Sequence, residues 1–124
     1  DKFAFSDDGR STLGTGLSSA TRGVAGAANS GTAAYFAGGT ASGTTVDKFT
    51  FSSDSRSTLG TGLSSSRANL AGAAESGTAA YFAGGGYAAT IDKFAFSDDS
   101  RTTLSPGLPA ALNYLAGAAN SGVL

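Results

Sequence analysis

Apolar and polar residues alternate along short runs, and clusters of turn-forming residues separate one run from the next. Residues 91–96 alternate with a period of two, which is typical of a strand with one covered face. Residues 69–74 and 79–83 are two further runs of small and apolar side chains, and a fourth run begins at Thr102. Gly, Ser and Asp fill the intervals, where they favour tight turns. The pattern predicts four short antiparallel strands in a unit of this kind.

The abundance of Ala and Gly does not predict helices. Gly recurs every few residues in the Ala-rich runs, and each Gly in a helix interior costs about 1 kcal/mol relative to Ala. Small residues instead allow sheets to pack closely face to face, while Phe and Tyr at fixed places supply most of the apolar area. We therefore expect an all-β fold.

The strand pattern recurs because the sequence is a tandem repeat of about 46 residues. The segment Asp1-Lys2-Phe3 returns at Asp47 and again at Asp92. Residues 25–39 return as 71–85 with one change in 15 positions. A repeat of this length, in which strand-like runs alternate with turns, is typical of propeller blades or another stacked β array, where each unit is covered by its neighbours.

We expect the whole chain to form one propeller-type domain that is divided unevenly into units. The first segment holds the last two strands of one unit and the connection that follows them. Two complete units come next, and the last segment provides the first strand of a further unit. These segments are residues 1–24, 25–69, 70–114 and 115–124. Because the outer segments are incomplete units, we expect a fragment of a longer repeat protein or one stretch of a larger assembly.

Each unit resembles a kelch repeat. The resemblance rests on a Gly-Gly doublet that ends a strand after an aromatic residue, at 35–39 and 81–85. It also rests on the aromatic strand and Asp-containing turn at 49–54, and on Arg67 shortly before a strand of small residues. Where kelch blades usually carry Trp, this sequence has Leu13, Leu59 and Leu104. The resemblance covers the whole chain and implies kelch-like β-propeller blades of four antiparallel strands, as a fragment of a larger ring.

Composition narrows the possible functions. The 124 residues include 8 Lys and Arg and 9 Asp and Glu, so a net charge of −1 provides no field that would attract nucleic acid or an anionic membrane. No apolar run approaches the length of a membrane-spanning helix. The sequence contains no Cys and no His, which excludes thiol chemistry and a Ser nucleophile with a His base. We expect no nucleic-acid or membrane partner, no cofactor and no enzymatic activity.

Two motifs are compatible with ligand chemistry but have simpler structural interpretations. Residues 13–19 are Gly-rich, yet they lack the third Gly of a phosphate-binding loop, and no helical pattern follows them. Aspartates in the turns could bind Ca²⁺ or form a glycosidase carboxylate pair, but they recur in every unit without the spacing of a known calcium loop. Turn stabilisation is the favoured interpretation, and we expect no metal site. These aspartates are Asp7, Asp8, Asp54, Asp98 and Asp99.

Basic residues also recur at fixed places in the unit. They could form a charged rim, or they could form ion pairs between neighbouring units and discourage edge pairing. The second interpretation is favoured because every copy keeps the same residues. The set is Lys2, Lys48 and Lys93 with Arg10, Arg56 and Arg101.

The places where the copies differ indicate a candidate binding surface. Successive connections in an antiparallel sheet alternate between its two ends, so the loops between second and third strands share one end with the connections between units. Both kinds of connection vary, whereas the turns at the other end are nearly uniform. Loops on a rigid scaffold often bind ligands, although drift of unconstrained loops would give the same pattern. The candidate contacts are Arg22, Arg67, Asn69, Tyr87, Asn113 and Tyr114.

The sequence favours a non-catalytic binding or adhesion module that presents variable loops to a glycan or protein. Its small, polar composition and near-identical repeats fit an extracellular, cell-surface or virion setting. The alternative is a structural repeat protein that self-assembles into a filament or coat through unpaired strand edges. A third interpretation is an enzyme of the kelch-like class with its site outside this stretch.

Overall fold

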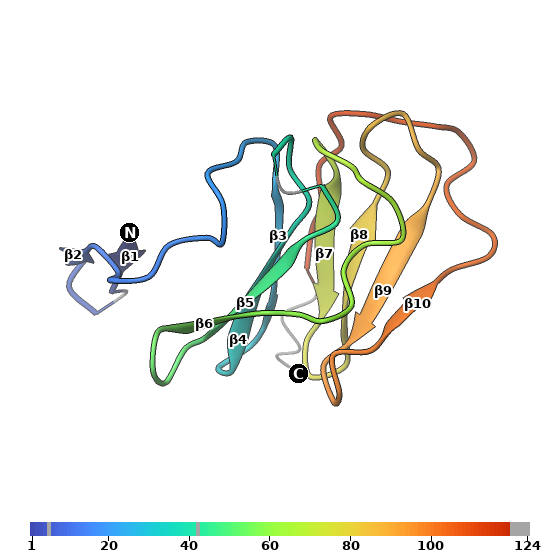
Figure 1. Ribbon diagram of the computed structural model, residues 1–124. Coiled ribbons are helices and arrows are strands. Elements are labelled where there is room, and N and C mark those ends of the chain that lie inside the picture. The colour runs from blue at the N-terminus through green and yellow to red at the C-terminus, as the bar shows by residue number, and fades with distance from the viewer. Residues whose placement is uncertain (5, 42, 120–124) are drawn as a thin grey trace.

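The computed structural model describes residues 1–4, 6–41 and 43–119. These residues form strands and no helix, so the predicted all-β fold is confirmed. The strands are β1 (Lys2–Phe3), β2 (Arg10–Ser11), β3 (Ala25–Asn29), β4 (Ala33–Ala37), β5 (Val46–Thr50), β6 (Ser55–Thr58), β7 (Ala71–Glu75), β8 (Ala79–Ala83), β9 (Ile91–Ala95) and β10 (Arg101–Thr103). Figure 1 shows three sheets that follow one another along the chain.

The two larger sheets have the same topology, with four antiparallel strands in chain order. We call β3–β6 the middle sheet and β7–β10 the last sheet, and β1 and β2 form a two-stranded first sheet. The pairing register repeats, because Tyr35 lies opposite Lys48 in the middle sheet and Tyr81 lies opposite Lys93 in the last. The predicted four-stranded units are therefore present, and the described residues form an open array rather than a closed ring.

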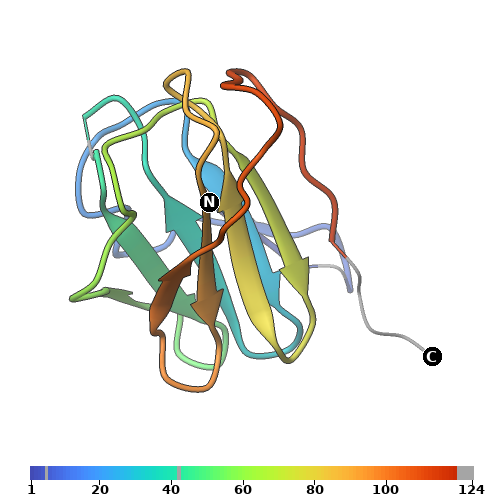
Figure 2. The ribbon, with the colours of Figure 1, turned by 90° about the vertical axis from the view of Figure 1, so that its right-hand side faces the viewer.

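The connections between strands separate into two groups at opposite ends of the sheets. The β3–β4, β5–β6, β7–β8 and β9–β10 turns lie at one end, which is the bottom in Figure 1. The β4–β5 and β8–β9 loops and the β6–β7 connection lie at the other. Figure 2 shows the same separation after a quarter turn. The variable connections of the sequence thus share one end of the molecule, which we call the loop end.

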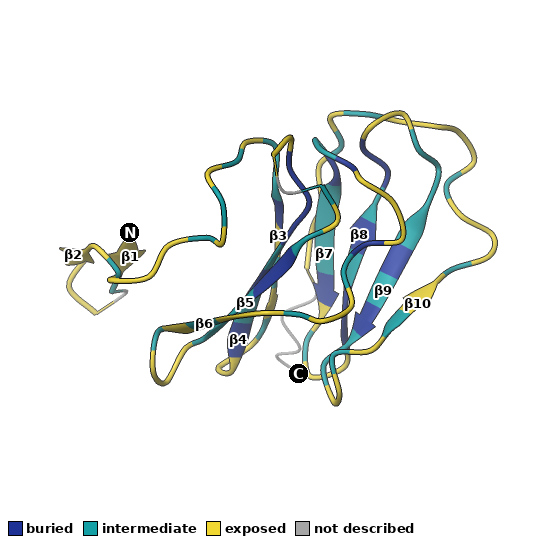
Figure 3. Ribbon diagram, in the orientation of Figure 1, coloured by how far each residue is buried: buried dark blue, intermediate teal, exposed yellow. Residues whose placement is uncertain are grey.

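The hydrophobic core lies between the middle and last sheets, where Figure 3 shows most of the buried chain. Tyr35, Phe82 and Phe94 are its largest fully buried apolar side chains. Strand β3 packs directly against β7, and a Cβ on Gly72 would collide with the carbonyl oxygen of Gly26. Glycine at this position is therefore what lets the two sheets approach closely.

Residues 115–119 extend this row of close contacts past β7. A Cβ on Gly117 would collide with the carbonyl oxygen of Gly72, just as a Cβ on Gly72 would collide with Gly26. Residues 115–119 form no strand pairing, although the sequence predicts the first strand of a further unit over 115–124. The rest of that predicted strand, residues 120–124, lies outside the described residues.

Candidate binding surface at the loop end

Two tyrosines dominate the exposed apolar surface of the loop end. Tyr87 lies in the β8–β9 loop and is 75% exposed, and Tyr114 lies in the segment after β10 and is 80% exposed. Among the large apolar side chains that the structure describes as exposed, these two have the highest exposed fractions. Both residues were predicted from sequence as candidate contacts, and the fold places both at the loop end.

Backbone hydrogen bonds hold the two tyrosine-bearing segments side by side. The Gly85 N–H donates to the Leu112 carbonyl at 2.9 Å. The Leu112 N–H donates to the Ala88 carbonyl at 3.3 Å, which completes an isolated antiparallel bridge. Tyr87 and Tyr114 each lie within two residues of this bridge. The two rings therefore project from neighbouring segments whose backbones support each other.

The backbone at Tyr114 is left-handed, with a φ of 55°. The equivalent residues of the other units, Gly23 and Asn69, have φ values of 70° and 58°. Backbone hydrogen bonds link the three residues in a row. The Asn69 N–H donates to the Gly23 carbonyl at 2.8 Å, and the Tyr114 N–H donates to the Asn69 carbonyl at 3.0 Å. Gly and Asn adopt this conformation readily, whereas it costs most other residues about 1–2 kcal/mol. Tyr87 has the same kind of backbone, with a φ of 58°.

The polar candidates at the loop end have mixed roles. Arg22 is exposed, and its carbonyl accepts a hydrogen bond from the Thr40 N–H at 3.0 Å. Asn69 is half-buried, and its backbone takes part in the row of hydrogen bonds just described. Asn113 is also half-buried, and its Oδ1 accepts a hydrogen bond from the Gly86 N–H at 3.2 Å. Arg22 is thus an exposed polar candidate, while Asn113 supports the loop that carries Tyr87.

Arg67 is buried and does not lie on the candidate surface. Its side chain points inward because three acceptors converge on the guanidinium. Nη1 donates to the carbonyls of Gly84 at 2.8 Å and Thr90 at 3.0 Å, and Nη2 forms an ion pair with Asp92. Arg67 therefore ties the β6–β7 connection to both ends of the β8–β9 loop, which is a structural role.

Asp92 is fully buried beside this arginine. Burial by itself raises the pKa of Asp92, but hydrogen bonds from Ser64 and Thr103 outweigh the effect of burial. The positive charge of Arg67 acts in the same direction, so the pKa of Asp92 lies below its ordinary value. The carboxylate is therefore ionised at neutral pH, and each of its oxygens accepts at least one hydrogen bond within the scaffold.

The turn aspartates have the local role that their sequence context favours. Asp8, Asp54 and Asp99 all have left-handed backbones, with φ values of 55°, 53° and 58°. Before two of them, Asp7 and Asp98 accept hydrogen bonds from backbone N–H groups two residues on, at 2.9 and 3.0 Å. Within the described residues, no group of three or more acidic side chains is placed to hold a metal ion.

Two of the three repeated lysines form ion pairs between neighbouring sheets. Lys2 pairs with Asp54 at 2.8 Å, and Lys48 pairs with Asp99 at 2.7 Å. Burial by itself lowers the pKa of Lys48, but its hydrogen bonds, led by the one to Asp99, raise the pKa above its ordinary value. Contacts between neighbouring units were the favoured prediction for these lysines, and the fold shows that the partner of Lys2 and of Lys48 is an aspartate in a turn of the next unit.

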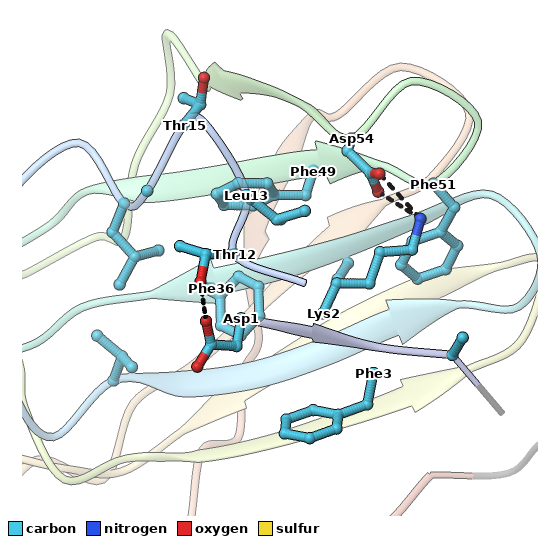
Figure 4. Close-up of a pocket in the computed structure, with 15 residues that line it drawn as sticks. Asp1, Lys2, Phe3, Thr12, Leu13, Thr15, Phe36, Phe49, Phe51 and Asp54 are labelled. Atoms are coloured by element: carbon cyan, nitrogen blue, oxygen red, sulfur yellow. Dashed lines mark hydrogen bonds and ion pairs between the residues drawn. The ribbon is translucent and has the colours of Figure 1, made fainter. Parts of the chain in front are cut away.

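A large apolar cavity lies between the first sheet and the middle sheet, away from the loop end. It has a volume of about 720 Å³, and Figure 4 shows Phe36, Phe49 and Leu13 beside it with the Lys2–Asp54 ion pair at one side. Sequence reasoning did not predict this cavity.

Neither a scan against protein-family models nor a search of curated proteins finds a match for this chain. In the part of the chain that the structure describes, no helix is long and apolar enough to cross a membrane. Two surface features of the described residues bear on function: the tyrosines of the loop end and the cavity beside the first sheet.

Proposed function

We propose that this protein is a non-catalytic binding module built from kelch-like β-propeller blades, and that its loop end binds a glycan or a protein. The observation that carries the proposal is the residue at one repeated left-handed position. Two units fill this position with Gly23 and Asn69, which suit it, and the third fills it with an exposed Tyr114. A costly residue at an exposed position is best explained by a contact that the residue makes with a ligand.

The chemistry of the tyrosines supports the same conclusion. A tyrosine offers a flat apolar ring and a hydroxyl at low cost in conformational entropy, and it is a favoured anchor in binding surfaces. Tyr87 and Tyr114 lie on segments that are bridged by backbone hydrogen bonds, so little ordering is needed when a ligand binds. The exposed Arg22 adds a charged group in another connection of the same kind.

The kelch-like assignment within this proposal is supported by the glycine doublets. Gly38 and Gly84 follow β4 and β8 directly, both are buried, and both have positive φ values of 73° and 63°. A Cβ on Gly38 would collide with the Arg67 carbonyl, and one on Gly84 would collide with the Leu115 side chain. The doublets are thus needed where each strand end meets the following connection. An extracellular, cell-surface or virion location is part of the same proposal.

The test is to probe a glycan array and an array of extracellular proteins with the tagged chain, and then to titrate any ligand that is retained. Tyr114→Asn and Tyr87→Gly remove the rings while suiting the left-handed backbone. We expect each variant to bind at least tenfold more weakly, because aromatic anchors typically account for 2 kcal/mol or more of binding. Phe3→Ala is the control, since it removes an exposed ring from the first sheet.

The proposal fails if neither array retains the wild-type chain, or if both tyrosine variants bind as tightly as the wild type. Loss of binding in Phe3→Ala alone would also contradict it, because the contact would then lie on the first sheet. Thermal unfolding of each variant shows whether a loss of binding arises from a loss of folded protein.

A second candidate function is self-assembly into a filament or coat. It is favoured by one observation: within the described residues, the outer strands of the two four-stranded sheets, which are β3, β6, β7 and β10, each pair with a neighbouring strand on one side only. Open edges of this kind can pair with another chain. Light scattering over a range of protein concentrations tests it, and a particle mass that does not grow with concentration contradicts it.

A further inference from the structure

Beside the last sheet, three oxygen atoms converge on one buried positive charge. Nη1 of Arg67 donates to the carbonyls of Gly84 at 2.8 Å and Thr90 at 3.0 Å, and Nη2 pairs with a carboxylate oxygen of Asp92. Arg67 and Asp92 are both buried, with exposed fractions of 3% and 0%. Two backbone carbonyls and one carboxylate thus form a site for a single positive charge in the interior of this unit.

The same three oxygens recur beside the middle sheet. By repeat equivalence they are the carbonyls of Gly38 and Thr45 and a carboxylate oxygen of Asp47. The Gly38 N–H donates to the Thr45 carbonyl at 2.9 Å, and the equivalent bond in the last unit is also 2.9 Å. The Ser18 N–H and the Thr58 hydroxyl donate to Asp47 at 2.7 and 2.6 Å, where the equivalent bonds to the other aspartate are 2.9 and 2.7 Å. The groups that hold the three oxygens are therefore the same in both units.

The two units differ in the side chain that faces these oxygens. Thr21 stands where the last unit has Arg67. Its hydroxyl accepts a hydrogen bond from the Ala41 N–H at 3.3 Å, and it lies so close to Gly39 that a Cβ there would collide with it. The Thr21 side chain therefore lies against the β4–β5 loop. Among the described residues it makes no hydrogen bond to Asp47, so it does not replace the guanidinium.

No other basic side chain that the structure describes forms an ion pair with Asp47. The positive charge of Arg56 lies near enough to act on Asp47, but Nη1 of Arg56 donates to the Gly16 carbonyl at 2.8 Å instead. Lys48, the next residue along β5, pairs with Asp99. The buried carboxylate of the middle sheet is therefore held by neutral hydrogen-bond donors, and a direct cationic partner would complete its surroundings.

We propose that Gly38, Thr45 and Asp47 bind a monovalent cation of the size of potassium in the place that the guanidinium takes in the last unit. A single carboxylate balances a single positive charge. The Arg67 nitrogen lies 2.8 and 3.0 Å from its two carbonyls, which is too far for calcium, whose oxygen ligands lie at about 2.3–2.6 Å. Backbone carbonyls are also the groups that replace the hydration shell of potassium in selective channels.

The bound cation would hold the β4–β5 loop, which lies at the loop end (Figure 1). Gly38 precedes this loop and Thr45 follows it, so one cation that contacts both carbonyls joins the two ends of the loop. Arg67 joins the two ends of the β8–β9 loop in the same way, through two carbonyls and a buried aspartate. One unit thus fixes its loop with a side chain of its own, and the other fixes it with an ion from solution.

The test is thermal unfolding of the wild-type chain in potassium chloride and in tetramethylammonium chloride, whose cation is too large for the site, at equal ionic strength. We expect the Tm to be about 4 °C higher in about 0.1 M potassium, because an ion that binds only the folded chain stabilises it. Sodium should raise the Tm less. In the isotope-labelled chain, potassium should shift the carbonyl carbon signals of Gly38 and Thr45 most.

Two exchanges between the units complete the experiment. Thr21→Arg supplies the guanidinium to the middle unit and should abolish the response to potassium. Arg67→Thr makes the opposite change and should add a second response, seen as shifts at Gly84 and Thr90. The proposal is overturned if the wild type has the same Tm in potassium and tetramethylammonium, if sodium acts as strongly as potassium, if Thr21→Arg keeps the full response, or if the carbonyl shifts are spread evenly along the chain.

Discussion

The middle and last sheets each bury an aspartate at the same position of the repeat, Asp47 and Asp92, but the groups around the two carboxylates differ. In the last sheet, Asp92 accepts hydrogen bonds from the Ser64 N–H and hydroxyl, both at 2.9 Å, and from Thr103 at 2.7 Å, and it pairs with Arg67. In the middle sheet, Asp47 accepts the same kinds of bonds. Thr21 stands in the position of Arg67, so no arginine reaches Asp47 from that connection. Both aspartates therefore share the hydrogen bonds from serine and threonine, and only Asp92 has the arginine.

This difference distinguishes the hydrogen bonds that stabilise the buried aspartate in both units from the arginine ion pair that is present in only one of them. A buried carboxylate needs hydrogen-bond donors, and Ser18 and Thr58 provide them for Asp47, with the charge of Arg56 nearby but no ion pair to it. Arg67 adds a buried charge that must stay paired, together with hydrogen bonds to the ends of the β8–β9 loop. The loop that carries Tyr87 is therefore held at both of its ends by this arginine.

The largest expected effect comes from replacing Arg67 with threonine, the residue that the other unit has at this position. Arg67→Thr leaves Asp92 without its cation and frees two carbonyls, so we expect the free energy of unfolding to fall by about 3 kcal/mol. Urea unfolding at pH 7 measures the change. The matched control is Arg22→Thr, since Arg22 is exposed in the equivalent connection, and we expect a change within about 0.5 kcal/mol. Equal losses in the two variants would contradict the distinction between the two sheets.

Acid should narrow the gap between Arg67→Thr and the wild type. The folded pKa of Asp92 lies below its ordinary value, so the stability it contributes is complete above about pH 4 and is lost as the pH falls through the folded pKa. Without Arg67 the folded pKa is less depressed, and less stability is lost on acidification. Urea unfolding at a series of pH values between 7 and 2.5 checks this. A gap that stays constant over the series would show that Arg67 acts through packing alone.

A smaller effect separates the two equivalent tyrosines of β4 and β8. The Tyr35 hydroxyl donates to Asp99 at 2.7 Å and is buried, whereas Tyr81 is half-buried and its hydroxyl makes no hydrogen bond within the described residues. Tyr35→Phe should therefore lower the free energy of unfolding by about 1.5 kcal/mol. Tyr81→Phe should leave it within about 0.5 kcal/mol of the wild type. Thermal unfolding of the two variants in parallel measures the difference, and similar losses would count against the interface contact.

The sequence predicted the fold because the relevant signals are local. Period-two alternation at 91–96 and turn residues between runs are enough to predict short strands, and the repeat predicts that they occur in matching sets. The burial of Arg67 depends on a contact with Asp92, which lies in a different strand, and an arginine in a variable connection gives no local sign of its direction. The lysine pairs were predicted as contacts between units, but their partners depend on how one sheet packs on the next.

The candidate surface was predicted in part for the same reason. Alternation of connections between the two ends of a sheet follows from antiparallel topology alone, so the shared location of Tyr87 and Tyr114 could be anticipated. Their left-handed backbones and the bridge between Ala88 and Leu112 could not, because both arise from hydrogen bonds between separate segments. The cavity beside the first sheet required packing as well, since it depends on what covers Phe36 and Phe49.

The smallest expected effect has the opposite sign and links stability to function. Tyr114 occupies the left-handed position that Gly23 and Asn69 fill in the other units, so Tyr114→Asn should raise the free energy of unfolding by about 1 kcal/mol. The reverse change, Asn69→Tyr, is the matched control and should lower it by a similar amount. Thermal unfolding measures both. If Tyr114→Asn instead destabilises the chain, the ring contributes to the scaffold, and the argument that it is kept for a ligand fails. If it stabilises the chain and also weakens ligand binding, the tyrosine is kept at a cost to folding that only binding explains.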